Sequence, residues 1–126
     1  MITKIFTPDA PAPAGHYSQA IVYNGLVYVA GQLPINPFST EKVAGDIEQQ
    51  TTQVLQNLDA VLKAAGSNRD LVLKVTIYVS DISLWATINK VYAAFFGDHR
   101  PARAVIPVKD LNYGYQLELE AIAAVA

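Results

Sequence analysis

Cysteine is absent from the 126-residue sequence, and methionine and tryptophan occur once each. A chain without thiols forms no disulfide, no thiolate nucleophile and no zinc–thiolate site, which is compatible with the cytosol. No apolar run approaches the roughly 20 residues of a membrane span. The N-terminal segment lacks the continuous apolar stretch of a signal peptide. We therefore expect a cytoplasmic protein without a membrane segment.

Charge is also scarce in this sequence. Charged residues make up 16% of it, against roughly 25% in an average domain. The formal net charge of −2 gives nucleic acid no overall attraction, so we expect no nucleic-acid partner. Hydrophobic residues make up 52%, which is more than the core of one small domain needs to hide. The length fits a single domain over residues 1–126, and the composition predicts an oligomer with apolar faces buried between subunits.

Alternating residues and turn residues dominate the first third of the chain. Residues 7–15 hold three of the seven prolines and are expected to form a loop. Asn24-Gly25 between two β-rich runs is a strong hairpin pattern. These patterns predict strands over residues 2–6, 17–23 and 26–31, followed by a turn-rich segment over 34–45.

A helical period begins at Asp46, with apolar residues on one face and glutamine, threonine and asparagine opposite. Asp46 can cap the start, and Gly66 suits the position just past the end, so we predict a helix of about 19 residues. The apolar positions on its face are Ile47, Val54, Leu55, Leu58, Val61, Leu62 and Ala65.

The remaining elements are one strand, one helix and two final strands. Residues 70–81 are apolar on both faces, which is typical of a central strand. Ser83 is expected to cap a second helix over 84–97, which Gly97 ends. Two last strands lie within 101–108 and 115–126. This order predicts an α+β fold, with both helices packed on one face of a single mixed sheet.

The last strand has two unlike faces. One face begins with polar residues and ends with apolar ones, which suits a subunit interface with a polar pocket at one edge. The other face is apolar throughout and suits the helices. Its residues are Leu117, Leu119, Ala121 and Ala123.

Arg103 interrupts the otherwise apolar stretch "PARAVIPV". A guanidinium keeps its charge in proteins, so it must face water or meet an anion. If the two terminal strands are neighbours, Glu118 or Glu120 could supply that anion. A structural salt bridge at an interface and a grip on a substrate carboxylate both remain open.

Glu118 and Glu120 are about 6.6 Å apart on one strand face, twice the rise per residue. Glycosidase carboxylates face each other across a substrate, whereas neighbours on one strand point in parallel, so that interpretation is disfavoured. A solvated face or cross-strand ion pairs is the simpler reading. His16 and His99 lie far apart without acidic residues at ligand spacing, so no metal site is expected, and His16 with Ser18 lacks the third member of a triad.

Gly31, Tyr17 and Asn89 are weaker candidates. Gly31 falls at a strand end, where a bare backbone can approach a ligand or simply form a bulge. Tyr17 and Asn89 carry polar groups without an evident partner, and a structural hydrogen bond is the simpler explanation for each.

Six segments with a recognisable pattern follow one another along the chain. They are "GHYSQA", "AGQLP", "QNLDAVLKAAG", "VYAAFFG", "RPARAVIPV" and "LELEAIA". Together they resemble the RidA family, also called YjgF, from about residue 3 to 126. The resemblance implies a chorismate-mutase-like fold and a homotrimer, with the sheets forming an inner barrel and the sites in clefts between subunits. It also implies hydrolysis of 2-iminopropanoate and 2-iminobutanoate to 2-keto acids and ammonia, without a cofactor.

The resemblance also implies roles for individual residues. Arg103 would bind the substrate carboxylate, and Glu118, rather than Glu120, would activate water. Val105 would offer a backbone group to the ligand. The other positions that match the family's substrate site are Tyr17, Gly31 and Asn89.

The chain departs from the family pattern in three respects. His16 replaces a proline before the conserved tyrosine position, and Asn112 replaces a proline in the loop before the last strand. Tyr113 and Tyr115 make that loop more aromatic, which bears on the choice of imine. The alternatives are a non-catalytic module that binds keto acids, a deaminase for another imine or enamine, and an RNA-cleaving translation inhibitor.

Overall fold

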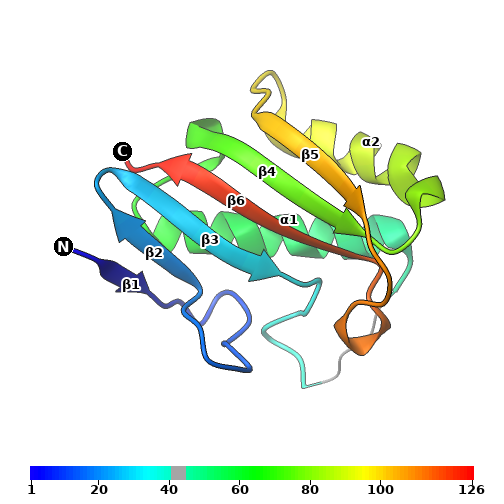
Figure 1. Cartoon of the computed structure of the whole chain (residues 1–126), viewed down its shortest axis with the longest axis horizontal. Helices are drawn as coiled ribbons and strands as arrows, with labels where there is room; N and C mark the ends of the chain where they lie inside the picture. Colours follow the sequence, from blue (N-terminus) through cyan, green and yellow to red (C-terminus); the bar gives the residue numbers. More distant parts are fainter. Residues whose placement is uncertain (41–44) are drawn as a thin grey trace.

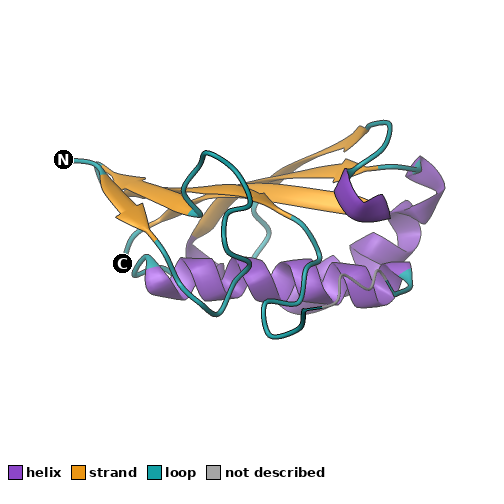
Figure 2. Cartoon of the chain, turned by 90° about the horizontal axis from the view of Figure 1, so that it is seen from below, coloured by secondary structure: helices purple, strands orange, loops and turns teal. Residues whose placement is uncertain are grey.

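The computed structural model describes residues 1–40 and 45–126, and in these ranges one sheet carries both helices on one face (Figures 1 and 2). The element order confirms the predicted α+β fold. Residues 41–44 of the expected turn-rich segment lie outside the described residues. The elements are β1 (Thr3–Ile5), β2 (Ala20–Tyr23), β3 (Leu26–Gln32), α1 (Ile47–Ala64), β4 (Val72–Val79), α2 (Trp85–Phe96), β5 (Ala102–Pro107) and β6 (Leu117–Ala124), with 3₁₀ turns η1 (Arg69–Leu71), η2 (Ile82–Leu84) and η3 (Asn112–Gly114).

The sheet is mixed, with the strand order β1-β2-β3-β6-β4-β5. Only β4 and β5 pair in parallel, and α2 makes the crossover between them. β4 lies between β5 and β6, as the apolar residues on both of its faces predicted (Figure 1). Asn24 and Gly25 have φ values of 53° and 81°, the backbone of a type I′ turn, which confirms the predicted hairpin of β2 and β3.

α1 begins and ends where the sequence predicts. The Asp46 side chain accepts a hydrogen bond from the Gln49 backbone at 2.8 Å. The Gln49 side chain in turn accepts one from the Asp46 backbone at 3.0 Å. This reciprocal capping box satisfies two backbone donors at the helix start. Gly66, with a φ of 79°, follows the last turn.

Some polar residues of α1 are buried, although the sequence pattern placed them opposite the core. Gln50 and Asn57 are each 1% exposed. The Asn57 side chain donates to the backbone oxygens of Leu33 and Ile35 at 3.0 and 2.9 Å. Gln50 accepts from the backbone of Gln116 at 2.8 Å. These side chains therefore fix the loop after β3 and the entry to β6.

α2 starts differently from the prediction, and the expectation that Ser83 caps it was wrong. The Asp81 side chain accepts a hydrogen bond from the Ser83 backbone at 2.9 Å and so starts the η2 turn. α2 then continues directly from η2, and no side chain caps its own start. Gly97, with a φ of 64°, ends the helix as predicted.

Tyr17 lies in a loop, not at the start of a strand as the alternation suggested. The cause is Gln19, which is 1% exposed and uses its carboxamide to hold the proline-rich loop. Its oxygen accepts from the Thr7 backbone at 2.7 Å, and its nitrogen donates to the backbone oxygens of Thr7 and Pro11 at 3.0 and 2.9 Å. Regular pairing therefore begins only at Ala20.

The two faces of the sheet are unequal. The face toward the helices holds the core, and the residues of β6 expected on that face are all buried. Neither helix covers the opposite face (Figure 2), where Tyr23, Tyr28 and Ile106 are 50%, 43% and 41% exposed. Large apolar side chains on an uncovered sheet are typical of a protein–protein interface. Among the described residues, no helix is long and apolar enough to cross a membrane.

Candidate functional site

Arg103 lies on the edge strand β5, on the same face of the sheet as its partner Val75, and therefore toward the helices. Its Nη1 donates to Asn89 Oδ1 at 2.9 Å. The guanidinium carbon lies 4.5 Å from the ring centroid of Trp85 and 4.9 Å from that of Tyr92. Within residues 1–40 and 45–126 no carboxylate lies at ion-pair distance from it. Its positive charge is held by neutral groups and remains available to an anion.

A hollow of about 480 Å³ opens beside this guanidinium. We call it the arginine hollow. Asn89, Tyr92, His99, Arg100 and Arg103 contribute to its lining. Two arginines and no acidic residue line it, so it suits a small anion.

A second hollow, of about 510 Å³, surrounds Glu118 and is called the glutamate hollow. Tyr17, Gly31, Asn112 and Tyr113 help to line it. Burial, and secondarily the charge of nearby Glu120, raise the pKa of Glu118 above its usual range. A carboxylate in this condition accepts a proton more readily than an exposed one, which suits a general base.

Gly31 explains how Glu118 can lie where it does. An added Cβ at position 31 would come within 2.5 Å of Glu118 Oε2. Gly31 falls in the irregular register between β3 and β6, so the bulge and the bare backbone together make room for the carboxylate.

The two carboxylates of β6 have different surroundings. Glu120 is exposed and accepts a hydrogen bond from the Tyr78 hydroxyl at 2.9 Å. That hydrogen bond is the main cause of the raised pKa of Tyr78. Glu120 therefore binds Tyr78 on the exposed surface of the sheet. Of the two carboxylates, only Glu118 lines the glutamate hollow.

Arg103 and Glu118 do not meet within one chain. The expectation that the terminal strands are neighbours was wrong, because β4 lies between β5 and β6. Two strand spacings separate them across the sheet, about 10 Å, and three register positions along it, also about 10 Å. Glu118 also lies on the opposite face from Arg103, since its partner in β4 is Tyr78 rather than a core residue. Each chain thus holds Arg103 and Glu118 in two separate hollows.

The remaining predicted residues divide between these places. Asn89 joins the arginine hollow, and Tyr17 and Gly31 join the glutamate hollow. The side chain of Val105 packs against the core and lines neither hollow. Because β5 is an edge strand, alternate backbone groups along it face away from β4 and stay available to a ligand or partner.

The loop that departs from the family pattern borders the glutamate hollow through Asn112 and Tyr113. Tyr113 has a φ of 63°, a left-handed conformation that is uncommon for a tyrosine. Its ring meets that of Tyr115 edge-on, with centroids 6.2 Å apart. Tyr113 therefore lies at the rim of the hollow, whereas Tyr115 is buried behind it and does not line it.

The histidines do not form a shared site. His99 Nε2 lies 2.7 Å from the backbone oxygen of Val72, and its ring meets that of Phe96. In the described part of the chain, no three side chains of histidine, aspartate or glutamate gather in a way that could hold a metal ion.

Three residues in or beside the two hollows were not predicted from the sequence. Trp85 and Tyr92 contact Arg103, and Gln19 organises the loop that carries Tyr17. Tyr92 fits the apolar stripe of its helix and therefore looks like core. The spacing of Trp85, Asn89 and Tyr92, four and then three residues apart, places them on one side of a helix and was the available signal.

Comparisons with known proteins agree with this architecture. The family model described as Endoribonuclease L-PSP matches residues 7–125. A RutC family protein of Pyrococcus horikoshii is 48% identical over 119 residues, which are 94% of each chain. A Rattus norvegicus protein named 2-iminobutanoate/2-iminopropanoate deaminase is 40% identical over 119 residues, 94% of this chain and 87% of its own. A crystal structure from Yersinia pestis, of the Rid protein family, has a TM-score of 0.96 at 44% identity, covering 99% of this chain and 100% of that one.

A single mixed sheet with two helices on one face thus occurs in a chain that has similar proteins over nearly its whole length. The chain belongs to the RidA family, also written YjgF or RutC. The chorismate-mutase-like fold implied by the sequence motifs is confirmed.

Proposed function

We propose that this protein hydrolyses small 2-imino acids, such as 2-iminopropanoate and 2-iminobutanoate, to 2-keto acids and ammonia. The observation that carries the proposal is the guanidinium of Arg103, which is oriented by Asn89 and two aromatic rings. Among residues 1–40 and 45–126 it has no carboxylate at ion-pair distance. The name of the rat relative, at 40% identity, supports the same reaction. No cofactor is required by this scheme.

Arg103 would bind the substrate carboxylate through two parallel charge-assisted hydrogen bonds. Because Asn89 occupies one hydrogen of Nη1, the edge formed by Nε and Nη2 is left for the ligand. The Asn89 amide nitrogen can donate to the same ligand. A backbone group of Val105 and the ring of Tyr17 would help to orient it.

Glu118 would supply the proton transfers. The substrate is the protonated imine, and the Glu118 carboxylate takes a proton from water while the water oxygen bonds to C2 and the C=N bond becomes single. The carboxyl then gives that proton to the amine nitrogen, which makes ammonia the leaving group. As C2–N breaks, the hydroxyl oxygen forms the C=O bond of the 2-keto acid, its proton returns to the Glu118 carboxylate, and this proton leaves with ammonia as ammonium. The raised pKa of Glu118, caused by burial and then by Glu120, makes its carboxylate a stronger base than an exposed glutamate.

We propose that the complete site forms between subunits of a homotrimer. The arginine hollow of one chain would face the glutamate hollow of its neighbour, since one chain holds the two hollows on opposite faces of its sheet. The uncovered sheet face, rich in exposed apolar side chains, would line the inside of the trimer. The low charge content agrees with this burial.

The first experiment generates 2-aminoacrylate with a serine dehydratase and follows keto-acid or ammonia release against the buffer rate. Wild type should accelerate release, Arg103→Ala should abolish the acceleration, and Glu118→Ala should lower it about 100-fold or more. Arg103→Lys should also be poor, because an ammonium cannot form the two-bond fork. A wild-type rate equal to buffer would refute the deaminase.

The shared site is tested by mixing two inactive variants. Arg103→Ala and Glu118→Ala chains, unfolded and refolded together, should regain activity because some interfaces receive Arg103 from one chain and Glu118 from the other. Each variant refolded alone is the control. Absence of any recovery in a mixed oligomer of confirmed size would contradict a site shared between chains.

A non-catalytic module that binds keto acids is the main alternative. It needs only the oriented charge of Arg103, and it would retain 2-ketobutyrate binding after Glu118→Ala without accelerating any hydrolysis. A deaminase for another imine would instead show activity only with a different substrate. The family description as an endoribonuclease adds an RNA-cleavage assay, with Arg103→Ala beside wild type, although the net charge of −2 disfavours that activity.

A further inference from the structure

We propose that Trp85 and Tyr92 are positioning residues, whose rings form an aromatic cradle that fixes the Arg103 guanidinium in its ligand-binding direction. The functional consequence rests on the proposed function of Arg103. The cradle itself can be measured without any enzymatic assay.

Helical spacing places the cradle beneath β5. Trp85, Asn89 and Tyr92 follow one another along α2 at intervals of four and three residues, so their side chains share one side of the helix. Arg103 extends over this side from the edge strand. Both ring centroids lie within the range of a cation–π interaction, at 4.5 and 4.9 Å from the guanidinium carbon.

Burial makes the cradle rigid on one side. Tyr92 is 6% exposed and belongs to the core cluster, and Trp85 is half-buried against the same core. Arg103 is exposed on an edge strand. A long exposed arginine would otherwise sample many rotamers, so contact with fixed rings restricts it before any ligand arrives.

Aromatic rings hold a guanidinium without neutralising it. A carboxylate in the same place would compete with a substrate carboxylate for the hydrogen-bonding fork. Ring faces attract the charge and leave the N–H groups, apart from the Nη1 hydrogen donated to Asn89, directed outward. The cradle therefore fixes the direction of the Arg103 guanidinium and leaves its positive charge free to pair with a ligand.

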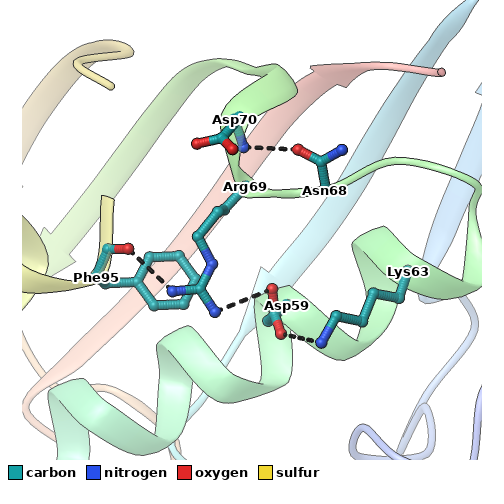
Figure 3. Close-up of polar contacts among 6 residues, drawn as sticks. All are labelled: Asp59, Lys63, Asn68, Arg69, Asp70 and Phe95. Carbon is teal, nitrogen blue, oxygen red and sulfur yellow. Dashed lines mark hydrogen bonds and ion pairs between the residues drawn. The ribbon is translucent and has the colours of Figure 1, made fainter. Parts of the chain in front are cut away.

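Arg69, which lies in η1, shows the contrasting case of an arginine against a ring of the same helix, α2 (Figure 3). Its guanidinium carbon lies 3.9 Å from the Phe95 ring centroid, and Nη1 donates to the Phe95 backbone oxygen at 3.0 Å. However, Nη2 pairs with Asp59 at 3.4 Å, and Lys63 contacts the same carboxylate at 2.8 Å. Arg69 is thus paired with a carboxylate of its own chain and contacts both α1 and α2, which makes Phe95 a matched control.

Trp85 is the only tryptophan in the chain, so its fluorescence reports directly on the cradle. Excitation at a wavelength that tyrosine does not absorb should give different spectra for wild type and Arg103→Ala. Titration with pyruvate or 2-ketobutyrate should produce a saturable change in wild type that Arg103→Ala lacks. Identical spectra for the two proteins would overturn the cradle, whether or not the protein proves to be a deaminase.

Substitutions then test the consequence for binding. Trp85→Leu should raise KM for the imine, and Kd for 2-ketobutyrate measured by calorimetry, by about fivefold to tenfold with little change in kcat. Trp85→Phe keeps a ring and should restore most of the affinity. Phe95→Ala should lower the melting temperature without raising either constant.

The outcomes separate the two proposals. If Trp85→Leu binds ligand as wild type does, or weakens binding no more than Phe95→Ala, the cradle has no positioning role. If wild type binds keto acids but hydrolyses no imine, the deaminase fails while the Kd series still decides the cradle. If no ligand binds at all, the ligand-binding role fails, and the fluorescence of Arg103→Ala still decides whether the stack exists.

Discussion

The carboxylate of Glu118 lies directly against the backbone of Gly31, with no room for a side chain between them. A Cβ at position 31 would come 2.5 Å from Oε2 and 3.2 Å from the carboxyl carbon. The obstacle is the end of a flexible side chain, which can move aside. Position 31 therefore controls where the carboxylate of Glu118 lies.

Gly31→Ala should lower kcat about tenfold to 100-fold, because a displaced general base loses part of the rate it contributes. Stability should change little, since the side chain of Glu118 can rotate away. The measurement is the imine hydrolysis rate beside a thermal melt. Gly15→Ala is the control, because its Cβ would meet only the Tyr17 ring at an ordinary 3.9 Å. Full activity in Gly31→Ala would show that the position of Glu118 does not limit the reaction.

The acid limb of the pH–rate profile should fall at a higher pH than an ordinary glutamate would give, because burial and then Glu120 raise the pKa of Glu118. A general base works when ionised, so activity is lost as pH falls through this raised value. Glu120→Gln removes the second cause and should move the acid limb to lower pH. The check is kcat/KM measured across pH for both proteins. Superimposable profiles would mean that Glu118 is not the titrating base.

The same raised pKa has an opposite effect on folding. The folded state binds the Glu118 proton more tightly than the unfolded state does, so its contribution to stability is fully present below the unfolded pKa and is lost as pH rises through the folded pKa. Glu118→Gln removes an ionisable buried group and should melt at a higher temperature than wild type at neutral pH. This advantage should shrink as the pH is lowered. A neutral-pH melting temperature below that of wild type would contradict the unfavourable burial of this carboxylate.

The hydroxyl of Tyr92 is buried without a hydrogen-bond partner among the described residues. Burial raises the pKa of Tyr92 to about 12, with a smaller opposing effect from Arg103. Tyr92→Phe should raise the free energy of unfolding by about 1 kcal/mol, since an unsatisfied buried hydroxyl is costly. Because the ring stays, ligand affinity should remain near that of wild type. Denaturant unfolding gives the first quantity, and a loss of stability would reveal a partner for the hydroxyl in the assembled protein.

Local features of the fold could be predicted from the sequence. The Asn24-Gly25 turn, the capping box at Asp46 and the alternation along β6 each depend on neighbours in the chain, and each is confirmed. The prediction that Ser83 caps α2 was wrong because Asp81, two residues earlier, accepts a hydrogen bond from the Ser83 backbone and starts the η2 turn instead. In each of these cases, hydrogen bonds and backbone preferences between near neighbours in the chain determined the structure.

The site could be predicted only as a set of residues. Chain order says nothing of order across a sheet, so the insertion of β4 between β5 and β6 was missed, and with it the separation of Arg103 from Glu118. The surroundings of Arg103 were missed for a related reason, since Trp85 and Tyr92 are indistinguishable from core residues until the helix is placed under the edge strand.

The location of the two hollows on opposite faces of the sheet affects how activity would depend on protein concentration. If each reaction centre needs an arginine from one copy and a glutamate from another, an isolated copy has no centre at all. The turnover per copy would then fall on dilution, unlike that of a self-sufficient enzyme. Near the concentration at which the copies assemble, the total activity in a cell would therefore rise more steeply than the concentration of the protein.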